Sequence, residues 1–170
     1  MKLETERLVL KEIDENHIDD ILKIRSNAYI NKFVKRNSPQ NNYDALEFIL
    51  HIKKETLNKQ MIFLGISFKD QRNLIGTIGL WKFSEDRKTA EIGYELLPDY
   101  HKKGIMSEAL KSVLKHSFDE LNLKEIFACT GKHNKDSQSL LSRHNFVSEE
   151  GRKDENNIEN FIFSLRKTTC

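Results

Sequence analysis

The chain has 170 residues, of which 38% are hydrophobic and 32% are charged, a balance typical of one water-soluble globular domain. Its formal net charge of +2 at pH 7 gives no general attraction to nucleic acid. No segment approaches the roughly 20 apolar residues of a membrane span, and the N-terminus lacks the apolar run of a secretory signal. We therefore expect a cytoplasmic protein, a monomer or homodimer, with neither nucleic acid nor membrane as a partner.

The N-terminal third is predicted to contain one strand followed by helices. Alternating apolar and polar residues predict a strand over Thr5–Ile13. Apolar residues then recur at helical spacing over residues 14–27, with Asp14 or Asn16 as the N-cap. A short helix is predicted over Ala28–Lys35 and a longer one over Tyr43–Leu57.

The pattern then changes to strands. Three of them, joined by short polar segments, are predicted over Met61–Lys69, Leu74–Phe83 and Ala90–Leu97. The remaining elements are a helix over Gly104–Leu121, a strand over Lys124–Thr130, a helix over Asp136–Arg143 and strands near Phe146–Glu149 and Phe161–Leu165. This order predicts a single α+β domain over residues 1–170, in which Ala90–Leu97 and Lys124–Thr130 are parallel because a helix connects them.

A cationic group precedes the helix that begins at Gly104. His101, Lys102 and Lys103 stand where the helix leaves its first amide N–H groups without partners and where its dipole is positive. A glycine there lets the backbone approach a ligand closely, so a pyrophosphate is one interpretation. The other is a simple turn with solvated lysines. The spacings of a P-loop or a dinucleotide fingerprint are missing, which disfavours ATP and NAD.

Cysteine and histidine usage predicts no metal and no disulfide framework. Cys129 lies in an apolar run, Cys170 is the last residue, and the six histidines are dispersed. A catalytic pair of Cys129 with His133 is one interpretation of the first thiol, and a buried strand cysteine is the other.

The segment AEIGYELLPDYHKKGIMSEAL, followed by NKDSQSLLSRHNF, resembles the GNAT superfamily of acyl-CoA-dependent N-acetyltransferases. Within it the chain is similar to the ribosomal-protein N-terminal acetyltransferases of the RimJ/RimL type, and the resemblance covers nearly its whole length. It implies a mixed, mostly antiparallel sheet of about seven strands, with a central parallel βαβ unit and helices on both faces. It also implies acetyl-CoA as cosubstrate.

The family's phosphate loop reads Gln/Arg-x-x-Gly-x-Gly/Ala. Here His101 takes the first place, Gly104 matches, Met106 replaces a small residue, and Lys102 replaces a common glycine. Because backbone amides of this loop bind the phosphate groups, these side-chain departures need not abolish binding of the cofactor. Asn134 and Ser137 match the family's Asn-x-x-Ser, although Ser137 could instead cap the helix that begins there. The resemblance implies cofactor binding by Leu96, Leu97, Lys102, Lys103, Gly104, Ile105, Met106, Ser107, Asn134 and Ser137, with the pantetheine arm between two splayed strands.

Acetyl transfer requires an amine, with a reference pKa near 10.4 for lysine, to lose its proton before it attacks a thioester. Glu91 is the first candidate for the base, because its position matches a catalytic glutamate of the histone-acetylating branch. It could instead only orient the amine, and Glu95, Glu150 and Glu155 are weaker alternatives.

Members of the family often protonate the leaving thiolate with a tyrosine, but residues 134–146 contain none, so we expect Ser137 to take that role. Tyr94 is expected to pack. The resemblance also implies that a backbone amide near Leu96 donates to the oxyanion.

The resemblance implies an acceptor pocket formed by roughly residues 26–40 and by the late strands. Residues 26–40 contain no acidic cluster for a polycation. Trp81 and Phe83 either line that pocket or are ordinary sheet residues. A peptide or protein N-terminal amine fits the RimJ/RimL branch. A small-molecule amine (antibiotic, amino acid or polyamine) is the alternative acceptor, and a non-catalytic acyl-CoA-binding module is the alternative to an enzyme.

Overall fold

Eight strands form one sheet in the computed structural model, which describes residues 1–168, so that Cys170 lies outside the described residues. The strand order is β1-β2-β3-β4-β5-β6-β8-β7, and only the β5–β6 pair is parallel. The predicted α+β class is confirmed, with eight strands in place of about seven. Their bounds are β1 Lys2–Glu4, β2 Leu8–Glu12, β3 Ile62–Phe68, β4 Gly76–Trp81, β5 Thr89–Leu96, β6 Glu125–Gly131, β7 Val147–Ser148 and β8 Asn160–Arg166.

The extra strand comes from the N-terminus, where one long strand was expected over Thr5–Ile13. The chain forms a hairpin instead, because the Thr5 amide donates to the Leu8 carbonyl and the Leu8 amide donates to Thr5 Oγ1, both at 3.0 Å. The predicted strand is therefore wrong at residues 5–7, which form the turn between β1 and β2.

Four α-helices accompany the sheet: α1 Ile18–Arg25, α2 Asn42–Leu57, α3 Ile105–Asp119 and α4 Lys135–Arg143. Asp14 accepts a hydrogen bond from the Asn16 amide, so Asp14 is the cap of the first helical segment. The helix expected over Ala28–Lys35 is only a 3-10 turn at Ile30–Lys32, because the Asn27 side chain accepts from two of the first amides and closes a turn. After α4, Asn145 adopts a left-handed conformation, with φ of 64°, which asparagine tolerates better than most residues.

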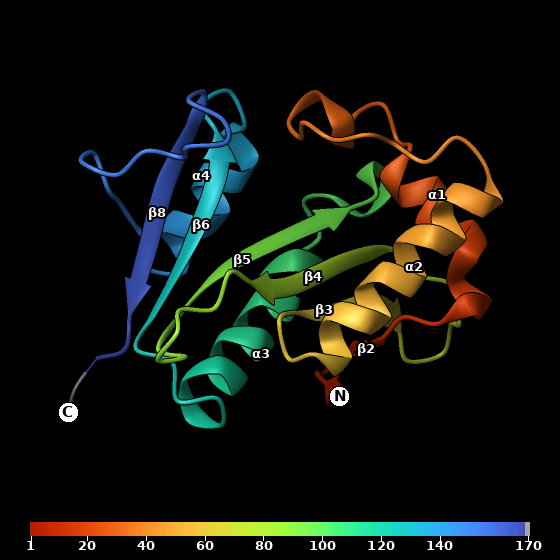
Figure 1. The fold of residues 1–170 in the computed structure, drawn as a ribbon, viewed down its shortest axis with the longest axis horizontal. Coiled ribbons are helices and arrows are strands. Elements are labelled where there is room, and N and C mark those ends of the chain that lie inside the picture. Colours follow the sequence, from red (N-terminus) through yellow and green to blue (C-terminus); the bar gives the residue numbers. More distant parts are fainter. Residues whose placement is uncertain (169–170) are drawn as a thin grey trace.

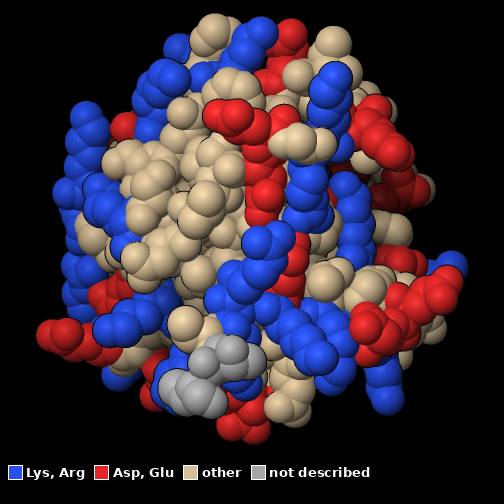
Figure 2. Space-filling view, turned by 90° about the vertical axis from the view of Figure 1, so that its left-hand side faces the viewer, with Lys and Arg blue, Asp and Glu red and all other residues tan. Residues whose placement is uncertain are grey.

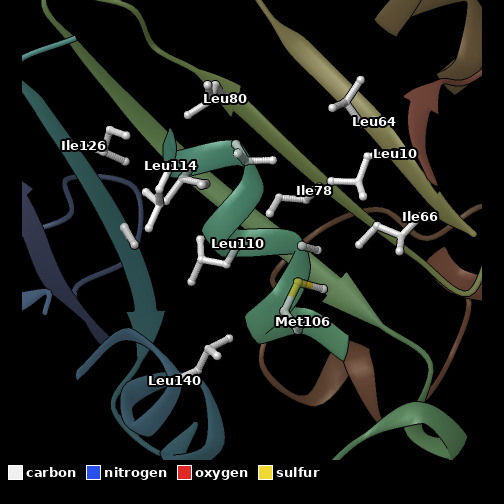
Figure 3. Close-up of a cluster of buried hydrophobic side chains, with 14 of the residues drawn as sticks. Leu10, Leu64, Ile66, Ile78, Leu80, Met106, Leu110, Leu114, Ile126 and Leu140 are labelled. Carbon is white, nitrogen blue, oxygen red and sulfur yellow. The ribbon is translucent and has the colours of Figure 1, made fainter. Parts of the chain in front are cut away.

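Helices cover both faces of the sheet, as expected (Figure 1). Figure 3 shows Met106, Leu110 and Leu114 of α3 packed against apolar side chains of the sheet, with Leu140 of α4 beside them. A second core cluster, containing Ile21, Ile24 and Ile49, fixes α1 and α2 on the opposite face. Among the described residues, no helix combines the length and the apolar composition needed to cross a membrane. On the face drawn in Figure 2, cationic and anionic side chains are interspersed.

The two central strands diverge. β5 and β6 pair only at three positions, from Thr89 opposite Glu125 to Glu91 opposite Phe127. Beyond that point β5 stays paired with β4 as far as Leu96, while β6 stays paired with β8 as far as Gly131. The sheet therefore divides into two hydrogen-bonded parts, one ending at β5 and the other at β6. The gap between β5 and β6 widens along the strands, as Figure 1 shows. The expected splay of these strands is confirmed.

Candidate active site

Two cavities meet in the gap between β5 and β6. The loop cavity, of about 660 Å³, lies between the segment before α3 and the start of α4. The strand cavity, of about 410 Å³, lies between β5 and β6 on the face that carries α1. The residues that line both of them are Phe33, Val34, Tyr94, Glu95, Asn134 and Ser137.

The start of α3 forms one wall of the loop cavity. Gly104 is its N-cap with φ of 72°, and no side chain caps the helix. The first amide N–H groups, including those of Ile105 and Ser107, therefore have no intrahelical partner. Lys102 also has a left-handed backbone, with φ of 59°, although it carries a side chain. Open amides, the helix dipole and a lysine together make an anion site at this wall.

The outer side of this loop is fixed by residues that the sequence did not single out. Arg7 Nη1 donates to the Lys103 carbonyl at 3.0 Å, while Arg7 Nε pairs with Glu108 Oε2 at 2.7 Å. Glu108 Oε1 also accepts from the Arg7 amide at 2.8 Å. The turn between β1 and β2 thus holds the loop in place. About a hundred residues separate the partners along the chain, so no local pattern could have revealed them.

Eight of the ten expected cofactor residues line the loop cavity: Leu96, Lys102, Gly104, Ile105, Met106, Ser107, Asn134 and Ser137. Lys103 does not, because its ammonium donates to the Asp99 carbonyl at 2.7 Å. Leu97 lies outside it as well. Its amide donates to the Ile75 carbonyl and its own carbonyl accepts from the Tyr100 amide. The Leu96 carbonyl, beside them, is bonded to the His101 ring at 2.7 Å.

Asn134, and not Ser137, caps α4. The Asn134 side-chain oxygen accepts from the Ser137 amide at 3.1 Å, which leaves the Ser137 hydroxyl without a capping role. That hydroxyl lies 2.9 Å from the Tyr94 hydroxyl, within hydrogen-bond distance. The alternative in which Ser137 caps the helix is therefore wrong, and the hydroxyl is available at the junction of the two cavities.

Tyr94 does more than pack. Its ring contacts the core beneath α3, and burial is the main reason why its pKa is raised to about 12, against the smaller effect of the bond with Ser137. The phenol is therefore protonated throughout the physiological range. Sequence reasoning missed this contact, because only the direction of β5 against α4 brings together two residues 43 positions apart.

Glu91 lies in the strand cavity near its narrow end. The residue is only 7% exposed, and its Oε2 is 2.6 Å from the Lys82 ammonium. Cys129 lines the same wall, and burial, followed by the charge of Glu91, raises the pKa of its thiol to about 12. Such a thiol is a poor nucleophile, and His133 is exposed, so the geometry favours the strand-cysteine interpretation.

Of the two aromatic residues considered for the acceptor pocket, only Trp81 lines a cavity. Trp81 lines the strand cavity and lies across Gly93, where an added Cβ would come within 2.2 Å of the indole ring. Phe83 instead packs against the core cluster. Trp81 is thus a wall of the candidate site, whereas Phe83 lies beyond the end of β4 at Trp81, so the strand expected as far as Phe83 is two residues too long there.

The other candidate bases are less suitable than Glu91. Glu95 is paired with Arg25 and Arg36. Glu150 and Glu155 are exposed and line neither cavity. The acidic residue of their segment that lines the strand cavity is Asp154, which is 9% exposed.

Residues 7–147 match the family model described as "Acetyltransferase (GNAT) domain". The chain belongs to the GNAT family of acetyltransferases. A relative that supports this is the uncharacterised N-acetyltransferase YoaA of Bacillus subtilis, which is 31% identical over 147 residues, covering 86% of this chain and 83% of YoaA.

Solved structures of this family share the fold. The ribosomal-protein-S5-alanine acetyltransferase of Vibrio fischeri superposes with a TM-score of 0.84 at 19% identity, covering 98% of this chain and 96% of that one. RimL, a ribosomal L7/L12 alpha-N-protein acetyltransferase solved with coenzyme A, gives a TM-score of 0.84 at 15% identity, covering 98% of both chains. The resemblance to the RimJ/RimL type is confirmed at the level of fold.

This GNAT protein is therefore an acetyl-CoA-dependent acyltransferase, and family membership favours the enzyme over the non-catalytic module. The loop cavity fits its cosubstrate on physical grounds. Open amides and Lys102 at its wall could hold a pyrophosphate, and an extended pantetheine arm could lie where β5 and β6 are no longer paired with each other.

Proposed function

We propose that the enzyme acetylates the N-terminal amine of a peptide or protein by direct attack within a ternary complex. The observation that carries the proposal is the shared end of the two cavities, at Tyr94, Glu95, Asn134 and Ser137. Acetyl-CoA in the loop cavity would present its thioester there. An amine in the strand cavity could then reach the carbonyl carbon without a covalent intermediate on the enzyme.

The proposed transfer balances as follows. The amine nitrogen forms a bond to the carbonyl carbon, the carbon–sulfur bond breaks, and the sulfur leaves with the bonding electron pair. An ammonium acceptor gives up two protons in all. One proton passes to Glu91 and then to solvent. The second restores the hydroxyl of Ser137, which has given its own proton to the sulfur. A backbone amide near Leu96 would stabilise the oxyanion.

Glu91 is proposed as the base because it lies at the narrow end of the strand cavity and because its only ion pair, within residues 1–168, is with a half-exposed lysine. The alternative is that Glu91 orients the ammonium while water removes the proton. The two roles predict different pH profiles for a Glu91 variant, as discussed below.

A peptide acceptor is supported by the walls of the strand cavity and by the named substrates of the similar structures. Asn156, Asn157 and Asn160 place amide groups along the cavity, where they could bond to a peptide backbone. The Vibrio fischeri enzyme and RimL are both named for ribosomal proteins. A ribosomal acceptor would place the reaction in the cytoplasm. The second candidate is a small-molecule amine, because about 410 Å³ lies within the usual size of a small-ligand site.

A thermal-shift titration with acetyl-CoA, CoA and ATP is the first test. A ligand at about 100 times its Kd stabilises the fold by about 2.7 kcal/mol. A saturating shift with acetyl-CoA and CoA, but not with ATP, is expected. Thiol release from acetyl-CoA is then measured with short peptides, free amino acids and polyamines. Binding without transfer to any peptide would overturn the peptide acceptor, and no shift at millimolar acetyl-CoA would overturn the proposed site.

A further inference from the structure

An arginine pair shares a single carboxylate in the wall of the strand cavity. Arg25 Nη1 lies 3.3 Å from Glu95 Oε1, and Arg36 Nη2 lies 2.6 Å from Glu95 Oε2. All three side chains are largely buried, with 14%, 11% and 10% of their surface exposed, and all three line the cavity. Two guanidinium groups and one carboxylate leave a net charge of +1 at this wall.

The remaining bonds of the two arginines do not remove this charge. Arg36 Nε donates to Asn31 Oδ1 at 3.1 Å, and Arg36 Nη2 also reaches the Arg25 carbonyl at 3.3 Å. The Arg25 guanidinium lies 3.6 Å from the centre of the Phe48 ring. Its Nε is buried and has no hydrogen-bond partner among the described residues. A buried guanidinium with an unused donor is an unfavourable arrangement unless an acceptor completes it.

The electrostatic environment of Arg25 agrees with this. The pKa of Arg25 is lowered to about 10, chiefly by burial; the charge of Glu95 opposes this lowering, and the charge of Arg36 contributes a smaller lowering of its own. Lys35 also lines the cavity and adds positive charge on the same side. An oxyanion brought in by a ligand would meet donors that are already in place, so little reorganisation would be needed.

The narrow end of the cavity has the opposite polarity. Glu91 and Asp154 line it, and both raise the pKa of the Cys129 thiol between them, while Lys82 has a smaller opposite effect. Asp154 is held in place by the Asn156 amide and the Asn160 side chain. The strand cavity is therefore dipolar along its length, with carboxylates at one end and arginines at the other.

We propose that the acceptor is an amine that carries an oxyanion a few bonds away, with the amine at the shared end of the two cavities, on the side that faces Glu91, and the oxyanion on Arg25 and Arg36. This inference rests on the proposed function, because it names the class of amine that the acceptor site takes. The oxyanion can come from the α-carboxylate of a free amino acid or from an acidic side chain in the first residues of a peptide. Polyamines, which lack an anion, are excluded by this arrangement.

The test uses acceptor pairs that differ by one negative charge, with release of CoA as the readout. Ser-Asp-Ala-Ala-amide is compared with Ser-Asn-Ala-Ala-amide, and free alanine is compared with alanine amide. We expect kcat/KM at least about tenfold higher for the anionic member of one pair, and that pair identifies the source of the oxyanion. Equal kcat/KM within both pairs would overturn this inference while leaving the proposed function intact. No transfer to any acceptor would overturn both.

Two variants of the wall predict changes of opposite sign. Arg36→Gln removes one positive charge and should reduce the preference for the anionic acceptor about tenfold. Glu95→Gln removes the internal counter-charge and should increase that preference. Lys32→Gln is the matched control, because Lys32 carries the same charge four residues from Arg36 but is exposed and lines neither cavity.

A merely structural ion cluster would give another result, in which both wall variants lower transfer to anionic and neutral acceptors equally. If Arg36→Gln fails to fold by thermal melting, Glu95→Gln alone decides, and an unchanged or reduced preference would contradict the proposal.

Discussion

The hydroxyl groups of Tyr94 and Ser137 lie 2.9 Å apart at the point where the two cavities join. A phenol is a stronger acid than an aliphatic alcohol, so Tyr94 is the better donor of the two. When it donates to Ser137, the serine hydrogen is free to point toward the leaving sulfur. Tyr94 is then a positioning residue for Ser137, which explains how the site could work without a tyrosine after Asn134.

Replacing Tyr94 with phenylalanine should lower kcat about tenfold, and Ser137→Ala should lower it by up to about a hundredfold. The affinity for acetyl-CoA, measured by titration, should change little in either variant. Tyr43→Phe, at a tyrosine that is 66% exposed, is the control. The double variant should be no slower than Ser137→Ala alone, because Tyr94 acts through the serine. Independent, multiplying effects would contradict this role.

Glu91→Gln should lower kcat/KM by about a hundredfold and flatten its rise with pH, because the glutamine keeps the size of the side chain but cannot accept a proton. The measurement is the pH profile of kcat/KM with one peptide acceptor. Glu155→Gln, an exposed carboxyl on the 149–159 segment, should leave the profile unchanged. A Glu91→Gln enzyme with a lower rate but the normal pH profile would assign the residue to orienting the amine.

Two left-handed positions in the phosphate loop should respond in opposite directions. Gly104→Ala places a Cβ at φ of 72° and should lower the free energy of unfolding by about 1 kcal/mol. It should also weaken the binding of acetyl-CoA. Lys102→Gly relieves the same kind of strain at φ of 59° and should gain up to about 1 kcal/mol. Urea denaturation measures both. Equal destabilisation by the two variants would show that backbone conformation does not limit this loop.

Long periodic elements were predictable from the sequence, and contacts between distant elements were not. Apolar residues recur over several turns of α2 and α3, and the boundaries of both helices lie within a few residues of the predicted ones. β1 has only three residues, too few to show a period, and the turn at residues 5–7 depends on a threonine side chain. The family motif located Gly104 and Asn134. The arginines on Glu95 come from segments 70 and 59 positions away in the chain, so only the folded sheet reveals them.

His144 predicts how stability depends on pH. Its Nε2 bonds to the hydroxyl of Ser107 at 2.7 Å, and burial, followed by the charges of Arg143 and Lys111, lowers its pKa below 6.5. The unfolded chain therefore binds more protons than the folded one between the two pKa values. The free energy of unfolding should be highest above pH 6.5 and should fall as the pH falls through the lowered pKa. His144→Gln should reduce this loss in melts between about pH 7 and pH 5, whereas the exposed His51→Gln should not. An identical pH dependence in both variants would show that His144 is not the group responsible.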